Sequence, residues 1–61
     1  MLETELRLLA RDFRARAQEL LLRAETMHDR DVCLKLREIA VGYERLARRV
    51  EERQSRNAMK A

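Results

Sequence analysis

The chain has 61 residues, a formal net charge of +3, no proline, one glycine and one cysteine. A chain this short seldom buries enough apolar surface to be stable alone, and the usual remedies are disulfides, a metal or oligomerisation. One cysteine excludes a disulfide within the chain, and one histidine beside it argues against a four-ligand zinc site. The composition therefore favours oligomerisation.

Heavy use of Leu, Ala, Arg and Glu without proline predicts an all-α protein. Apolar runs such as Leu20-Leu21-Leu22 are far too short for a membrane span, so we expect no membrane partner. Residues 1–5 are acidic, and no apolar segment of a signal peptide follows them. A lone cysteine is typical of a reducing compartment, so we expect a cytoplasmic protein.

The first predicted element is a helix over about residues 3–27. Apolar residues recur there at intervals of three and four, a period close to that of an α-helix. This stripe consists of Leu2, Leu6, Leu9, Phe13, Ala17, Leu20, Ala24 and Met27, and Ala10 and Leu21 widen its flank.

A turn is predicted at residues 28–29. Asp29 is a favourable N-cap, and Asp31 follows where the dipole of a second helix favours negative charge. Since neither glycine nor proline forces a break, one continuous helix is the alternative. Helix phase favours a hairpin, because the first stripe, continued straight, would run into Glu38 and Arg45.

The second predicted helix covers about residues 30–57, and residues 58–61 are expected to form a frayed tail. Its apolar residues are spaced 4, 3, 4, 3, 4, which is a heptad seam: Val32, Leu36, Ile39, Tyr43, Leu46 and Val50. Gly42 inside this helix costs about 1 kcal/mol relative to alanine. In a hairpin Gly42 comes level with Ala15, so we expect the two backbones to approach closely there.

Two helices side by side bury only part of each stripe. We therefore predict an antiparallel helical hairpin, covering residues 1–57, that pairs into a homodimeric four-helix bundle. The expected oligomer interface consists of Leu6, Leu9, Phe13, Leu20, Val32, Leu36, Ile39, Tyr43, Leu46 and Val50. The pattern leaves open whether the assembly is a dimer or a tetramer, and how the hairpins are oriented.

A second, weaker repeat lies behind these stripes. It consists of Leu8, Leu22, Leu34 and Val41, with Ala15 between the first two. Scattered surface leucines are normal in folded proteins. The alternative is a second contact face, used for a tetramer or for another protein.

The turn region gathers four side chains that can bind metals: His28, Asp29, Asp31 and Cys33. Their spacing matches no standard zinc pattern, so we expect a polar turn and no cofactor, with a metal site shared between two chains as the alternative. No Ser–His or Cys–His pair lies within helical reach, because His28 and Cys33 straddle the turn, and this argues against an enzyme. Tyr43 is interpreted as a core residue and not as a stacking platform for a base.

Basic residues concentrate near the C-terminus, where residues 45–61 hold six Lys/Arg against two Glu. The set Glu44, Arg48, Glu52 and Arg56 has the i,i+4 spacing of a self-neutralising ladder. This leaves a basic ridge of Arg45, Arg49, Arg53 and Lys60. Such a ridge suits phosphate groups of RNA or DNA. A solvated helix face is the simpler interpretation, and we favour it.

Residues 13–19 (FRARAQE), the cap at Asp29 and residues 39–47 (IAVGYERLA) resemble a family of short, uncharacterised helical-hairpin proteins of rhizobia-like alphaproteobacteria. The resemblance covers about two-thirds of the chain. It implies a bacterial hairpin fold but no activity, because the family has none established. The architecture is also similar to that of Rop-type RNA-binding hairpin dimers, as an analogy of shape that carries no function.

These observations predict a small, non-catalytic interaction or scaffold module that binds itself. Two alternatives stay open. One is a nucleic-acid-binding hairpin that uses the basic ridge. The other is a regulatory protein that docks on the helices of another protein.

Overall fold

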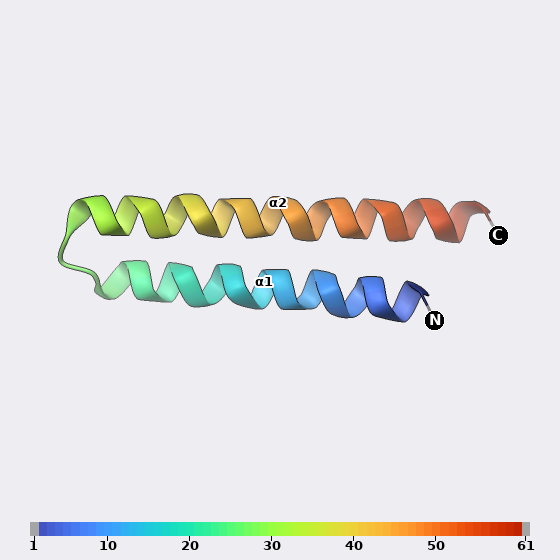
Figure 1. The fold of residues 1–61 in the computed structure, drawn as a ribbon, viewed down its shortest axis with the longest axis horizontal. Helices are drawn as coiled ribbons and strands as arrows, with labels where there is room; N and C mark the ends of the chain where they lie inside the picture. Colours follow the sequence, from blue (N-terminus) through green and yellow to red (C-terminus); the bar gives the residue numbers. More distant parts are fainter. Residues whose placement is uncertain (1, 61) are drawn as a thin grey trace.

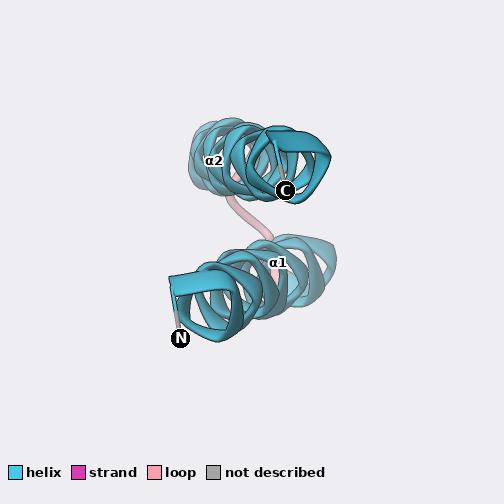
Figure 2. Cartoon of the chain, turned by 90° about the vertical axis from the view of Figure 1, so that its right-hand side faces the viewer, coloured by secondary structure: helices cyan, strands magenta, loops and turns pink. Residues whose placement is uncertain are grey.

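The computed structural model describes residues 2–60, apart from the side chains of residues 58–60. It contains two α-helices, α1 (Leu2–Thr26) and α2 (Arg30–Lys60), joined by residues 27–29. The helices run antiparallel in one layer, so that α1 begins and α2 ends at the same end of the molecule (Figures 1 and 2). The Cα trace measures 50 × 14 × 10 Å. The predicted all-α hairpin is confirmed.

The turn has the cap that the sequence predicts. Oδ1 of Asp29 accepts hydrogen bonds from the backbone N–H groups of Asp31 (2.9 Å) and Val32 (3.3 Å). The carbonyl of Asp29 accepts the first helical bond of α2, from the N–H of Cys33 at 3.0 Å. Asp29 therefore satisfies N–H groups that would otherwise lack a partner at the start of α2.

The helix ends differ slightly from the expected ones. α1 ends at Thr26, whose hydroxyl donates to the carbonyl of Arg23 at 3.0 Å. α2 continues to Lys60, so residues 58–60, expected to fray, are part of the helix. A long helix without Gly or Pro near its end has no residue that would stop it earlier.

Alanines occupy the centre of the contact between α1 and α2. The buried residues are Ala10, Ala17 and Ala24 of α1 and Ala40 and Ala47 of α2. Within each helix they lie seven residues apart, and Cys33 continues the α2 series with a half-buried side chain. Because the distance between helix axes depends on the side chains at the contact, alanine at every seventh position lets the helices pack closely.

Large apolar side chains lie beside this alanine seam and are only half-buried. They are Leu6, Phe13, Leu20, Leu21, Leu36, Tyr43 and Val50. The rings of Phe13 and Tyr43 meet across the two helices, with centroids 6.0 Å apart and planes inclined at 33°. This geometry is a favourable aromatic contact, and it fixes Phe13 level with Tyr43.

The expected close approach at Gly42 is wrong for the hairpin alone. A Cβ atom built on Gly42 would meet nothing within 4 Å, and the residue has no positive φ. Ala15 is exposed, because it lies two residues before the buried Ala17 and so points away from α2. Neither close packing nor backbone conformation inside the hairpin therefore explains this glycine.

Candidate functional site

The hairpin has two sides that differ in chemistry. A residue directly before a buried alanine points about 100° away from it around the helix. Two antiparallel helices are related by a two-fold axis perpendicular to their layer, so these preceding residues project to the same side from both helices. We call it the Ile39 side; it carries Leu9, Arg16 and Arg23 from α1 and Val32, Ile39 and Leu46 from α2.

The predicted oligomer interface divides into two sets. Six of its residues, Leu6, Phe13, Leu20, Leu36, Tyr43 and Val50, are half-buried along the seam. The other four, Leu9, Val32, Ile39 and Leu46, are exposed on the Ile39 side, where Ile39 keeps 48% of its surface and Leu46 42%. The hairpin itself therefore leaves more than two-fifths of the surface of each residue in this second set exposed.

An apolar hollow lies in the middle of the Ile39 side. It has a volume of about 370 Å³ and is lined by Ile39, Gly42, Tyr43 and Leu46. These residues have the spacing i, i+3, i+4, i+7, which is the set of four that forms a hole for a knob side chain from a packed helix. Because Gly42 has no side chain, the space between Ile39, Tyr43 and Leu46 stays unfilled.

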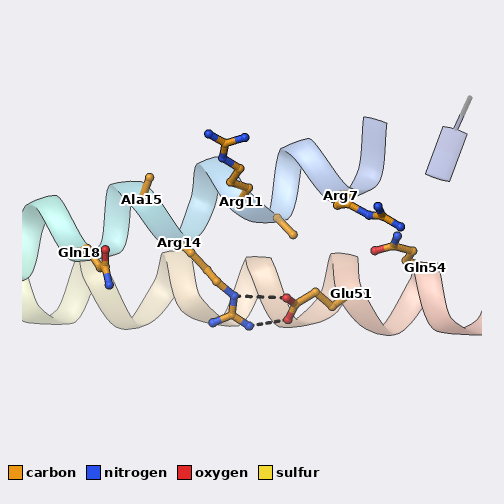
Figure 3. Close-up of a pocket in the computed structure, with 8 residues that line it drawn as sticks. Arg7, Arg11, Arg14, Ala15, Gln18, Glu51 and Gln54 are labelled. Carbon is orange, nitrogen blue, oxygen red and sulfur yellow. Dashed lines mark hydrogen bonds and ion pairs between the residues drawn. The ribbon is translucent and has the colours of Figure 1, made fainter. Parts of the chain in front are cut away.

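The opposite side, which we call the Glu51 side, is mostly polar, although it also carries Leu21, Leu34 and Val41. Arg14 and Glu51, each four residues after a buried alanine, form an ion pair between the helices (Figure 3). Nε of Arg14 donates to Oε2 of Glu51 at 3.3 Å, and Nη2 donates to the other carboxylate oxygen. Hydrogen bonding from Arg14 lowers the pKa of Glu51, and the same bond raises the pKa of Arg14.

A cleft of about 450 Å³ surrounds this ion pair. It is lined by Arg7, Ala10, Arg11, Arg14, Ala15, Gln18, Glu51 and Gln54 (Figure 3). The arginines give it a positive character. Glu51 neutralises the innermost of them, Arg14, so the cleft does not offer three free guanidinium groups to an anion.

The four leucine and valine residues of the predicted second contact face do not share one surface. Leu8 and Leu22 each lie two residues before a buried alanine, so they point away from α2. Leu34 and Val41 directly follow Cys33 and Ala40, so they project from α2 toward the Glu51 side. The hairpin separates the two pairs into different patches.

The basic ridge is exposed on α2. Arg45, Arg49 and Arg53 are all exposed, and Arg53 occupies the next heptad position after Leu46 on the Ile39 side. The Lys60 side chain lies outside the described residues. The ion pairs among the described residues are Arg14–Glu51 and Lys35–Glu38. The pairs expected within the ladder of Glu44, Arg48, Glu52 and Arg56 are therefore not formed there.

The turn does not assemble its four candidate metal ligands. Among the described side chains, His28, Asp29, Asp31 and Cys33 form no group of three that could hold an ion. The Asp29 carboxylate is engaged as the cap of α2. Within the same part of the chain, neither helix contains a stretch long and apolar enough to cross a membrane.

The alanine seam is the feature that sequence reasoning missed. The signal is present, since alanine recurs every seven residues at positions 10, 17 and 24 and again at 40 and 47. The stripe predicted for residues 3–27 includes the first three of these alanines, but the stripe predicted for residues 30–57 passes beside Ala40 and Ala47. The sequence therefore predicts one oligomer interface of ten residues, of which the structure places Leu9, Val32, Ile39 and Leu46 on the Ile39 side.

Comparison with protein-family models, curated proteins and solved structures gives no match for this chain. The resemblance to the rhizobia-like family stays an expectation. Any function must therefore be argued from the two sides of the hairpin.

Proposed function

We propose that the protein is a non-catalytic interaction module that binds a second copy of itself through the Ile39 side. The observation that carries this proposal is the position of the apolar residues: the small ones lie between the helices and large ones lie on the surface. Small alanines fill the contact within the hairpin, while Leu9, Val32, Ile39 and Leu46 stay exposed along one side. An exposed apolar surface of this kind marks an interaction site.

The surface area of the hairpin supports pairing. It exposes 5445 Å² for a mass of 7.3 kDa. A compact monomer of that mass exposes about 4,200 Å². The excess of about 1,200 Å² is larger than the roughly 800 Å² that each partner buries in an interface of standard size. Two hairpins that join their Ile39 sides form a four-helix bundle and remove this excess.

Light scattering and sedimentation at micromolar concentration test the proposal. We expect a mass of twice the chain, and we expect Ile39→Asp to convert the assembly to monomers, because a carboxylate in the apolar contact would be buried without a partner. Val41→Asp is the matched control, since Val41 is exposed to a similar extent on the Glu51 side. A monomeric wild-type protein with full helix content would refute the proposal.

The basic ridge supports a second candidate function, binding to the phosphates of nucleic acid. Its support is the run of exposed arginines at positions 45, 49 and 53. Against it stands the lack of aromatic side chains beside them, because stacking on bases uses aromatic rings. We rank it below self-association. For either function we propose a reducing cytoplasmic setting, in which the Cys33 thiol stays unpaired.

A further inference from the structure

We propose that the second copy packs antiparallel with α2 against α2, so that Ile39 of each copy fills the hollow formed by Ile39, Gly42, Tyr43 and Leu46 of the other. This inference rests on the proposed function and adds the arrangement of the two hairpins. It assigns the otherwise unexplained Gly42 to the contact between copies.

Gly42 is the first support. Glycine is the least favourable residue after proline in a helix interior, and here nothing inside the hairpin requires it. Its missing side chain matters only to something that approaches from outside. It lies between Ile39 and Leu46, in the middle of the exposed apolar stripe of α2. A partner side chain entering there reaches the ring of Tyr43.

Symmetry makes Ile39 the natural occupant. In a two-fold contact, a residue that fills a hole on the partner is matched by the same residue filling the same hole in return. Ile39 is the exposed side chain nearest the middle of the stripe from Val32 to Leu46. A two-fold axis beside it lays the two stripes along each other over their whole length.

The charges of α1 fit the same axis. On α1 a second hollow, of about 510 Å³, is lined by Asp12, Ala15, Arg16 and Glu19. Phe13 is level with Tyr43, so Arg16 is level with Ala40 and the two hollows lie at the same height along the hairpin. Arg16 lies on the Ile39 side, whereas Asp12 and Glu19 each lie two residues after a buried alanine and so form the outer edge of that side. The axis that places Ile39 in the hollow of the second α2 brings Arg16 to the edge formed by Asp12 and Glu19 of the second α1.

The other antiparallel arrangement packs α2 against α1 of the second copy, and it would place the apolar stripe of α2 against the charged hollow of α1. Ile39 would enter the hollow of Asp12 and Glu19, and Arg16 would face the apolar stripe. Both contacts would cover charged groups with apolar side chains and remove them from water, which is unfavourable. The observed pattern therefore selects like helices as neighbours.

Cross-linking distinguishes the two arrangements. In a Cys33→Ser background, Gly42→Cys and Ala15→Cys variants, which keep Arg16 in place, are mixed, allowed to exchange, and treated with a short bis-maleimide. We expect 42–42 and 15–15 products by mass spectrometry. A predominant 42–15 product would overturn this inference while leaving the dimer intact. A wild-type monomer in sedimentation would instead remove the proposed function, and this inference with it.

Substitution of Gly42 gives an independent readout. Gly42→Leu fills the hollow, so we expect the dimer dissociation constant to rise roughly tenfold or more, while helix content is kept. Ser55→Leu is the matched control, because it adds the same side chain on the Glu51 side of α2. Unchanged dimer affinity for Gly42→Leu would show that the hollow does not receive the second copy.

Discussion

At the scale of single residues, Asp29 determines where α2 begins. Its carboxylate accepts two backbone N–H groups of α2, from Asp31 and Val32, and no glycine or proline is present to help end α1. The break between the helices therefore depends on side-chain capping.

We expect Asp29→Ala to destabilise the hairpin by about 0.5–2 kcal/mol, the range measured for loss of an N-cap. Urea denaturation followed by circular dichroism, at one fixed protein concentration, measures the change. Asp29→Asn should behave like the wild type, because asparagine caps as well as aspartate. A stabilised Asp29→Ala variant would mean that the chain gains from a continuous helix.

This cap was predictable because capping is local chemistry, set by a residue and the three that follow it. Which apolar residues of α2 face α1, and which face outward, was not predictable. Large residues such as Leu36 and Tyr43 can belong to a seam with Cys33 and Ala40 or to one with Val32 and Ile39. Periodicity allows both, and only the close packing of alanines decides that the first seam faces α1.

At the scale of the helices, the ion pair of Arg14 and Glu51 links α1 to α2 on the Glu51 side. The sequence instead suggested pairs within α2, because i,i+4 spacing is visible in a sequence and pairing across a hairpin is not. The register of α1 against α2 brings together residues 37 positions apart. Such a contact depends on the exact length of the turn.

We expect this pair to make stability depend on pH. The pKa of Glu51 in the folded chain lies below its ordinary value of 4.5, because Arg14 holds the charged form. The stabilisation is therefore fully present above about pH 4.5 and is lost as the pH falls through the lower, folded-state pKa. Melting temperatures of the wild type and Glu51→Gln should differ at pH 7 and converge in acid.

Glu52→Gln provides the control for that measurement, since Glu52 is exposed and forms no ion pair among the described residues. Its difference from the wild type should stay small at every pH. High salt should shrink the Glu51→Gln difference as well, because both partners are half-exposed and screened. A difference that persists in acid would mean that Glu51 acts through packing.

At the scale of the whole molecule, the hairpin buries small side chains and leaves large apolar ones exposed. Alanine seams contribute little burial per residue, and the larger side chains that could contribute more are exposed along the Ile39 side. The sequence predicted that Leu9, Val32, Ile39 and Leu46 belong to apolar stripes. It could not predict that they share one side of the hairpin with Arg16 and Arg23 of α1, because that requires both helices in place.

The last prediction concerns the exposed arginines of the basic ridge, which span about 12 Å of helix from Arg45 to Arg53. If they bind phosphates, affinity for duplex DNA must fall with salt, and each lost contact must flatten the log–log slope by about 0.9. We expect no duplex RNA or DNA binding by the wild type at low salt. We also expect Arg49→Gln with Arg53→Gln to stabilise α2 by about 0.2–0.5 kcal/mol, because the i,i+4 repulsion is removed.

Fluorescence anisotropy with labelled duplexes, at several salt concentrations, and thermal melting of the same double variant supply both readouts. Arg7→Gln with Arg11→Gln is the matched control, since it removes the same charge at the same i,i+4 spacing from α1. Wild-type binding that weakens with salt and is reduced by the α2 pair more than by the α1 pair would establish the ridge as a nucleic-acid site. Binding reduced equally by both pairs would reflect net charge alone, since non-specific association follows the overall field of the protein.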